Sequence, residues 1–461
     1  MKKLLLLLSV VLAGCGGGGG DSPADDTPTL NPQSNPTLQI KAESTVVLTA
    51  DQIACSVVSH MYGEVTYPSS YNGSFPIPKA ESILPSGVVR SMAIVDATPL
   101  GPGPFRAGQG MCKDEHTYAL NVWKETLNRI QLTGSNRVVI YGWAGYDDLT
   151  KSIWNLNKTS FIPTVDSDLK FVVDEAKKRN LEVFYSQQFD YTDLKGNSLD
   201  PNTITKEDFK KTLDAYHAFI VNQAKFAQSI GIAGIGVDWA YPVIDKILPK
   251  MTSYDPVFRT MWLNKMYLII DDIKSVFSGK LIIGAVDTAI DSKIADKVDA
   301  MAITPHFGTY FVTAEENKNL TVDLLKSKYN AELKNIDTDI SNQLNGGPIN
   351  LPVIWNVQVQ SNSDYYVSGW TETVLCVKFP CPQLTYKTDF SVQAIGYEAL
   401  LQVVNEQKYF KNSAVNIDVG YWLTDDLTPH ITGTHPGFPN LNQSVRNKPA
   451  EAIVKYWFSR G

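Results

Sequence analysis

The sequence predicts the α/β class, with a single (β/α)8 TIM barrel as its architecture. Three observations lead to this prediction. The chain holds eight short apolar runs, a segment with helical spacing follows each run, and most runs end in an aromatic, an acid or an amide. A parallel strand in a closed barrel is covered on both faces, so its middle is continuously apolar. Polar side chains are then expected at the carboxyl ends of the strands, where this fold carries its active sites.

The eight strands and the helices between them alternate along the chain. The expected strands are Val88–Asp96, Arg137–Tyr146, Glu182–Asp193, Gly234–Tyr241, Lys280–Thr288, Ala300–Gly308, Pro352–Ser361 and Ala414–Asp426. The expected helices are Lys113–Leu132, Ser167–Arg179, Thr205–Ile230, Tyr254–Ser278, Ser292–Val298, Thr321–Leu344, Asp389–Tyr409 and Lys448–Ser459. Right-handed crossovers between successive strands give a parallel sheet that closes. An open doubly wound sheet is the alternative, and the lack of GxGxxG after the first strand argues against its nucleotide-binding versions.

Local signals set the ends of two of these helices. Thr205 begins a Thr-Lys-Glu-Asp sequence that is typical of a capping box, and Gly231 is placed to end the same helix. Gly279 is expected to end the next helix in the same way. Both helices are therefore predicted with defined boundaries.

The first 15 residues are predicted to be an export signal. Lys2 and Lys3 precede the apolar run Leu4–Leu12, which is too short to span a bilayer permanently. The sequence Leu12-Ala-Gly-Cys15 resembles a bacterial lipobox, and the resemblance implies cleavage before Cys15 and acylation of that residue. An ordinary signal peptide with a chance cysteine is the alternative. A glycine rather than an aspartate at position 16 points to the outer membrane of a bacterial cell envelope.

Residues 16–50 are expected to be a flexible, disordered linker. Gly16–Gly20 and the Pro/Asp/Thr/Ser/Asn-rich stretch that follows cannot bury enough apolar area to fold. We therefore predict a lipoprotein tether that joins a membrane anchor to a barrel domain of residues 51–461.

The remaining cysteines fit an exported protein. Without Cys15 an even set of four is left, and we expect disulfides between Cys55 and Cys112 and between Cys376 and Cys381. Two pairs of free thiols are the alternative. The sequence contains neither a CxxC motif nor a His cluster with metal-ligand spacing, so we expect no metal and no cofactor.

The composition supports a large core and argues against nucleic acid as a partner. Hydrophobic residues make up 43% of the 461 residues, and the net charge is −7 with no basic block. We expect a monomer, with neither nucleic acid nor anionic lipid as its binding partner.

The fourth strand carries the sharpest chemical signal. It reads Gly234-Ile-Gly-Val-Asp238-Trp239-Ala-Tyr241-Pro242, with an acid just beyond an apolar run and aromatic residues around it. A carboxyl group can transfer protons at a glycosidic bond, while aromatic rings stack on the apolar faces of sugars. Asp238 is therefore the predicted acid/base of a sugar-cleaving site. A buried acid that pairs with an arginine or caps a loop is the structural alternative.

This segment resembles the fourth strand of family 18 chitinases, whose pattern is Asp-Gly-x-Asp-x-Asp-Trp-Glu-Tyr-Pro. The matching residues are Gly234, Asp238, Trp239, Tyr241 and Pro242. Ala233 and Gly236 stand where the pattern has acids, and Ala240 stands where it has the catalytic acid. The resemblance thus implies a sugar site without the proton donor of that family.

A broader resemblance is to clan A glycoside hydrolases, and it covers nearly all of the mature chain. It rests on the strand order, on Gly420–Asp426 and on Arg446–Glu451. It implies catalytic carboxylates at the ends of strands four and seven, and a sugar subsite floored by Trp422. Strand seven offers the amides Asn356 and Gln358 instead of a carboxylate.

Three explanations of that departure stay open. Asp190, Asp287 or Asp425 could pair with Asp238 as an inverting pair, which needs carboxyl groups roughly 6.5–9.5 Å apart. An amide on strand seven could instead orient a substrate acetamido group or a water. Finally, the barrel could have lost hydrolysis and kept sugar binding.

Residues late in the strands complete the candidate site, and each has a core or loop position as its alternative. The substrate-binding candidates are Trp143, Tyr146, Gln188, Trp239, Tyr241, His306, Trp355, Asn356, Gln358, Trp422 and Asp425. The sequence thus predicts a glycoside hydrolase-like lipoprotein that acts on a polysaccharide or oligosaccharide. The alternatives are a non-catalytic glycan-binding lipoprotein and a barrel with lyase or aldolase chemistry, although no strand-end lysine supports an aldolase.

Overall fold

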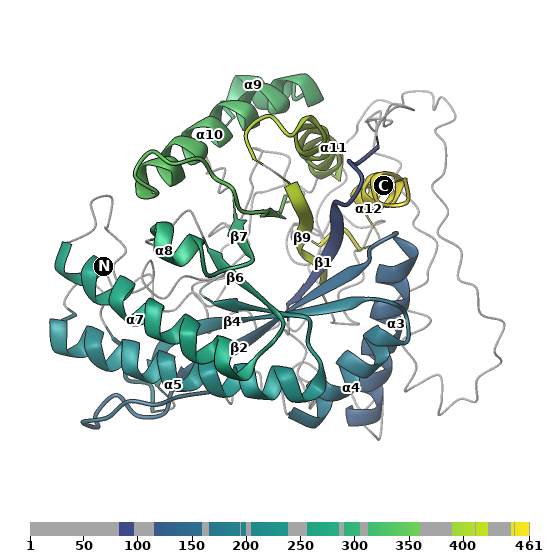
Figure 1. Ribbon diagram of the computed structural model, residues 1–461. Coiled ribbons are helices and arrows are strands. Elements are labelled where there is room, and N and C mark those ends of the chain that lie inside the picture. The colour runs from purple at the N-terminus through teal and green to yellow at the C-terminus, as the bar shows by residue number, and fades with distance from the viewer. Residues whose placement is uncertain are drawn as a thin grey trace, which may run out of the picture.

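Eight parallel strands close into a barrel, which confirms the predicted fold class (Figure 1). The computed structural model describes residues 83–95, 115–158, 166–193, 195–199, 204–237, 256–284, 290–304, 312–359, 390–410, 412–422, 444–446 and 448–460. The barrel strands are β1 (Val89–Val95), β2 (Arg137–Tyr146), β4 (Glu182–Asp193), β5 (Gly234–Val237), β6 (Lys280–Gly284), β7 (Ala300–Ile303), β8 (Val353–Val357) and β9 (Asn412–Trp422). They follow one another around the barrel in chain order, and β1 pairs with both β2 and β9.

Helices surround the barrel on its outside (Figure 1). They are α3 (Glu115–Leu132), α4 (Asp166–Lys177), α5 (Lys206–Ile230), α7 (Pro256–Val276), α8 (Ser292–Ala295), α9 (Ala314–Lys318), α10 (Val322–Gln343), α11 (Phe390–Glu406) and α12 (Pro449–Phe458). Every predicted strand and helix has a counterpart here. The short α9 and the short strand β3 (Leu156–Lys158), which pairs antiparallel with β2, were not expected from the sequence.

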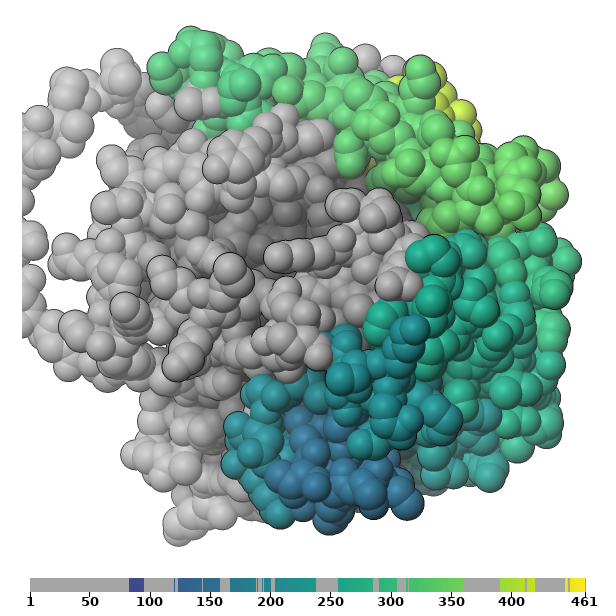
Figure 2. Space-filling model, turned by 90° about the vertical axis from the view of Figure 1, so that its left-hand side faces the viewer, coloured from purple at the N-terminus to yellow at the C-terminus, as the bar shows by residue number. Residues whose placement is uncertain are grey.

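Ion pairs join neighbouring helices of this outer layer. Between α5 and α7, Lys265 Nζ lies 2.5 Å from the Asp214 carboxylate and His217 Nε2 lies 2.8 Å from that of Asp272. In Figure 2 the teal segment with α7 and the green segment with α10 form adjoining parts of the outer surface. Among the described helices, none has the length and apolarity that crossing a bilayer requires.

The predicted ends of α5 are confirmed, and the role expected of Gly279 is corrected. Thr205 Oγ1 accepts a hydrogen bond from Asp208 N at 3.1 Å, and Gly231 ends the helix with a φ of 74°. The next helix, α7, ends at Val276, before Gly279. A Cβ at Gly279 would come within 2.7 Å of the Ala233 carbonyl oxygen, so glycine is needed there for close backbone approach.

The alternation of side chains along the strands divides the core in two. One set points outward and packs against the helices, and the other fills the lumen of the barrel. The apolar lumen residues are Ala93, Val139, Tyr141, Phe184, Ile282, Ala300, Ala302, Ile354 and Ala414. The lumen is therefore a packed core, as expected for an eight-stranded barrel.

A buried cation fills the amino end of the lumen. Arg137 and Glu182 are the first residues of β2 and β4, and their side chains form an ion pair at 2.6 Å. The guanidinium carbon of Arg137 also lies 3.7 Å from the centre of the Phe184 ring, a cation–π contact. Polar groups available for function must therefore lie toward the opposite, carboxyl end.

The first and last helices of the ring are joined by a buried ion pair. Arg129 of α3 donates two hydrogen bonds to Glu451 of α12, at 2.8 and 2.7 Å. Both side chains are almost fully buried, at 2% and 5% exposure. Since these helices flank β1, the pair holds the two ends of the domain together.

Removing one partner of this pair should destabilise the barrel strongly. We expect Arg129→Met to lower the free energy of unfolding by about 3–5 kcal/mol, because Glu451 would keep a buried charge without its cation. Urea unfolding followed by circular dichroism measures the loss. The exposed pair Lys170–Asp174 of α4 supplies the control, and Lys170→Met should cost less than about 1 kcal/mol. Equal losses for the two variants would contradict the assignment.

Candidate active site

The lumen becomes polar toward the carboxyl ends of the strands. On β8, Asn356 follows Ile354 on the lumen face, and on β9, Asn416 follows Ala414. Asn416 Nδ2 donates to Asn356 Oδ1 at 2.9 Å and lies 3.4 Å from the Tyr141 hydroxyl. Hydrogen bonds thus connect three strands across the lumen, above its apolar layer.

A further contact extends this network to β7. Asn356 Nδ2 donates to Thr304 Oγ1 at 3.1 Å, so both ends of the Asn356 amide are engaged. Asn416 is fully buried, and its Oδ1 has no hydrogen-bond partner among the described residues. The same holds for Oγ of Ser186, a buried residue of β4. The network therefore keeps hydrogen-bonding capacity for a small polar group in the lumen.

Asp418 follows Asn416 by two residues on β9. Val415 and Ile417 belong to the outer core and Ala414 to the lumen, and the regular pairing of β9 with β1 ends at Ile417. The exposure of Asp418 is 8%, whereas Ala414 and Asn416 are fully buried. Asp418 is not among the site residues predicted from the sequence, although polarity increases along β9 from Ala414 through Asn416 to Asp418.

The backbone of β9 changes at the same point. β9 pairs with β1 in register up to Ile417, and pairing resumes at Tyr421 after a shift. A second shift occurs in β4 between Phe189 and Asp193, a stretch that includes Asp190. Bulges of this kind redirect side chains and occur often beside active sites. Asp418 and Asp190 thus both lie at irregular ends of barrel strands.

Asp418 also lies near a buried tyrosine of α11. Burial raises the pKa of the Tyr397 phenol well above its ordinary value; a hydrogen bond donated by the Val359 backbone N–H opposes this, and the charge of Asp418 adds to it. The Val359 carbonyl oxygen also accepts a hydrogen bond from Gln393 Nε2 at 2.9 Å. Polar contacts from α11 therefore support the ends of β8 and β9 from the outside.

Two of the predicted substrate-binding aromatics face away from the lumen. The Tyr146 hydroxyl is 3.1 Å from Thr212 Oγ1 of α5, and its ring packs edge-on against Trp154. The Trp355 ring packs edge-on against Phe410, and both Tyr146 and Trp355 are buried in the outer core. The structure thus puts these rings in the core, because their positions in the alternation point them at the helices.

Asn356 and Gln358 are both buried near the barrel mouth, and the described part of the chain gives no further predicted site side chain. The backbone positions of Trp143, Gln188, Asp190 and Trp422 lie in strands, but their side chains are outside the described set. The predicted residues outside the described ranges are Asp238, Asp287, Trp239, Tyr241, His306, Asp425, Cys15, Cys55, Cys112, Cys376 and Cys381. Asp238 follows directly after Val237, the last residue of β5.

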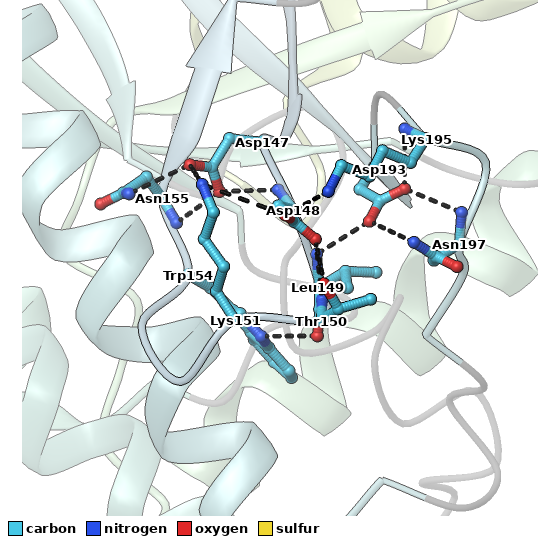
Figure 3. A network of polar contacts seen from close by, with 10 residues as sticks. All are labelled: Asp147, Asp148, Leu149, Thr150, Lys151, Trp154, Asn155, Asp193, Lys195 and Asn197. Atoms are coloured by element: carbon cyan, nitrogen blue, oxygen red, sulfur yellow. Dashed lines mark hydrogen bonds and ion pairs between the residues drawn. The ribbon is translucent and has the colours of Figure 1, made fainter.

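A polar network joins the carboxyl ends of β2 and β4 (Figure 3). The Asp193 carboxylate accepts hydrogen bonds from Asn197 Nδ2 at 2.9 Å and from the backbone N–H groups of Leu149, Lys195 and Asn197 at 2.8, 3.0 and 2.7 Å. Lys195 Nζ lies 2.6 Å from the Asp148 carboxylate. Four donors satisfy Asp193, so this carboxylate holds the loops beside the mouth.

The electrostatics of the network agree with that structural role. Desolvation opposes ionisation of Asp193, but the hydrogen bonds from Asn197, Leu149 and Lys195 outweigh it and hold the pKa below its usual range. The hydrogen bond from Lys195 likewise holds the pKa of Asp148 below its usual range. Neither group is therefore suited to donate a proton near neutral pH. Within the described ranges, no group of three His, Cys, Asp or Glu side chains is arranged to hold a metal ion.

The fold is similar to that of TIM-barrel glycoside hydrolases. A β-1,4-mannanase of glycoside hydrolase family 113 aligns at 14% identity with a TM-score of 0.50, over 82% of this chain and 100% of that one. A family 113 β-mannanase from Alicyclobacillus acidocaldarius aligns at 12% identity with a TM-score of 0.45, over 81% and 97% of the two chains. No protein-family model and no curated protein sequence matches the chain. At these identities the similarity shows a shared barrel fold, and the resemblance to family 18 chitinases stays a prediction.

The stability contributed by Asp193 should depend on pH. Because its folded pKa lies below that of the unfolded chain, its stabilising contribution is present above the unfolded pKa and is lost as the pH falls through the folded pKa. We expect Asp193→Asn to be less stable than the wild type at pH 7 by about 1–3 kcal/mol. The difference should narrow below about pH 4.

Thermal and urea unfolding between pH 2 and pH 8 measures this difference. Asp339→Asn, at an exposed position on α10, is the control and should show no such narrowing. A stability difference between wild type and Asp193→Asn that stays constant down to pH 2 would refute the ionised role of Asp193.

Proposed function

We propose that the protein is a cell-envelope lipoprotein whose barrel binds a polysaccharide or oligosaccharide at the carboxyl ends of its strands and hydrolyses O-glycosidic bonds. The observation that carries the proposal is the hydrogen-bonded polar layer of Tyr141, Asn356 and Asn416 in the lumen of a TIM barrel. Polar side chains at this end of such a barrel favour a substrate site, because packing alone would be served by apolar residues.

The similar structures suggest which sugar polymer to test first. The neighbour with the TM-score of 0.50 is named as a β-1,4-mannanase, so β-1,4-mannan is the first polymer to test. The shared fold by itself hosts many activities, and the choice between sugars must come from the site. Oligomers of glucose and N-acetylglucosamine are the natural comparison substrates.

Asp238 is the proposed general acid, since it directly follows β5 and has aromatic neighbours in the sequence. Asp190, Asp287 and Asp425 are the candidates from the sequence for the second carboxyl group. The residues proposed to contact the sugar are Trp143, Gln188, Trp239, Tyr241, His306, Gln358, Trp422 and Asp425. Tyr146 and Trp355 are not included, because both are core residues.

β8 is the seventh strand of the barrel, and the residue at its end argues against a retaining double displacement. Asn356 stands there, and its amide is engaged with Asn416 and Thr304. An amide is a poor nucleophile, and one held at both ends is poorly placed to attack a sugar carbon. Inversion through a bound water is therefore the favoured route.

The amide of Asn356 on β8 also favours a second candidate function. A barrel with amides where a catalytic carboxylate is expected could bind a glycan without cleaving it. In that case Cys15 would anchor a monomeric sugar-binding protein to the membrane. Hydrolysis and binding are separated by direct assay.

The test uses the chain without its first 15 residues and measures new reducing ends on β-1,4-mannan, cello-oligosaccharides and chito-oligosaccharides. We expect the wild type to release reducing ends from at least one polymer and Asp238→Asn to lose about 10²–10⁴-fold in rate. Asp339→Asn, at an exposed position on α10, should retain wild-type activity. Binding without hydrolysis by the wild type would support the glycan-binding alternative. Unchanged activity of Asp238→Asn would remove that residue from the mechanism.

A further inference from the structure

The carboxyl ends of β2 and β4 continue beyond the closed part of the barrel. β1 pairs with β2 up to Tyr141, and β5 pairs with β4 up to Ser186. Among the described residues, the later parts of β2 and β4 pair with each other, up to Tyr146 and Asp193, and β2 also pairs with β3. One side of the mouth therefore carries a three-stranded extension of residues 142–146, 156–158 and 187–193.

One face of this extension is packed against α5. Tyr146 forms a hydrogen bond of 3.1 Å with a side chain of that helix, and the Phe189 ring packs edge-on against a tyrosine ring of the same helix. Alternation puts Gly145 on the other face, with the backbone positions of Trp143 and Gln188, which are register partners. This second face continues the lumen side of the two strands, so it leads outward from the polar layer.

Two loops end the extension, and they are bound to each other (Figure 3). The first rim loop, residues 147–155, joins β2 to β3, and the second rim loop, residues 195–199, follows β4. The Asp193 carboxylate accepts backbone hydrogen bonds from both loops, at 2.8 Å from Leu149 and at 2.7 Å from Asn197. Lys195 Nζ then reaches from the second loop to within 2.6 Å of the Asp148 carboxylate in the first. The ion pair therefore fixes one rim loop against the other.

The rim loops expose hydroxyl and amide side chains. Ser152 and Asn155 of the first loop and Asn197 and Ser198 of the second are all exposed. Hydroxyl and amide groups can both donate and accept hydrogen bonds, as the hydroxyl groups of a neutral sugar require. The extension thus presents the hydrogen-bonding chemistry that a neutral glycan chain needs.

From this geometry we propose that the extension is a platform for the outer units of a neutral glycan chain, with Lys195 as the residue that positions its rim loops through Asp148. The proposal rests on the proposed function and deepens it, because it names where a long substrate lies. Lys195 acts through the loops and not on the reacting atoms.

The ion pair suits this role because it orders the loops without carrying the fold. Lys195 is 61% exposed, and exposed ion pairs contribute little to the stability of a whole domain. Gly145 lies four residues after Tyr141 of the polar lumen layer, which is about 13 Å along the strand. Loosening the rim loops should therefore weaken the binding of outer glycan units and leave the binding of a unit at the lumen unchanged.

The experiment measures the Kd of dimers and hexamers of β-1,4-linked mannose, glucose and N-acetylglucosamine by calorimetry on the full chain. The variants are Lys195→Met, Lys195→Arg and the control Lys151→Met. Lys151 is the matched control because it is 57% exposed and lies 3.5 Å from Asp147 and 4.0 Å from Asp148, both acids of its own loop. Lys151→Met thus removes a lysine from the same acids without separating the two rim loops.

We expect the wild type to bind a hexamer more tightly than the dimer of the same sugar. Lys195→Met should weaken hexamer binding about three- to tenfold, since the ligand must then order the loops, and should leave dimer binding within about twofold. Lys195→Arg and Lys151→Met should keep the hexamer Kd of the wild type. Hydrogen exchange gives a readout that needs no sugar: amides of residues 147–155 and 195–199 should exchange faster in Lys195→Met and not in Lys151→Met.

An unchanged hexamer Kd in Lys195→Met overturns the proposal, as do equal losses for dimer and hexamer or an equal loss in Lys151→Met. A lowered thermal midpoint of Lys195→Met together with weaker binding of both oligomers would make the role structural, which also refutes it. A wild type that binds hexamers no more tightly than dimers removes the platform and leaves the proposed function standing. A wild type that binds none of these sugars contradicts the proposed function as well.

Discussion

The closed lumen is the constraint on which the rest of this structure depends. Eight parallel strands leave no solvent between them, so each inward side chain must either be apolar or find a hydrogen-bond partner inside the barrel. The bond between Asn416 and Asn356 meets that requirement across β8 and β9. Because the two amides are hydrogen-bonded to each other, the barrel fixes the position and direction of both side chains.

The polar groups of this protein divide into those that are fully satisfied and those that are not. Three groups have charge or hydrogen-bond partners. The pair of Arg129 with Glu451 joins helices, the pair of Arg137 with Glu182 closes the amino end of the lumen, and Asp193 with its four donors holds loops. Asn416 Oδ1 lacks a partner among the described residues. Buried groups of the first kind stabilise the fold, while an unsatisfied group at a barrel mouth indicates a ligand position.

This chain and the family 113 β-1,4-mannanase share a barrel fold. At 14% identity the common feature is the arrangement of strands and helices. The residues at strand ends are free to change because loops and side chains there contribute little to barrel packing. The inverting route proposed above depends on Asn356 of β8 rather than on the shared fold.

The sequence by itself determined the architecture. Continuous apolar runs, the capping box at Thr205 and the terminating Gly231 are local signals, and each led to the correct element. Local periodicity also indicated which end of the barrel is polar. The apolar pattern did not indicate which of two neighbouring residues faces the lumen. Both faces of a barrel strand are buried, so inward and outward residues are equally apolar.

Only the tertiary structure decided that question. It turned Tyr146 and Trp355 toward the helices, and it brought Asn356, Asn416 and Tyr141 together from distant parts of the chain. It also showed the register shift of β9 after Ile417, which only strand pairing defines. The reason is physical: the direction of a side chain in a closed barrel is set by register and closure, which are properties of all eight strands together.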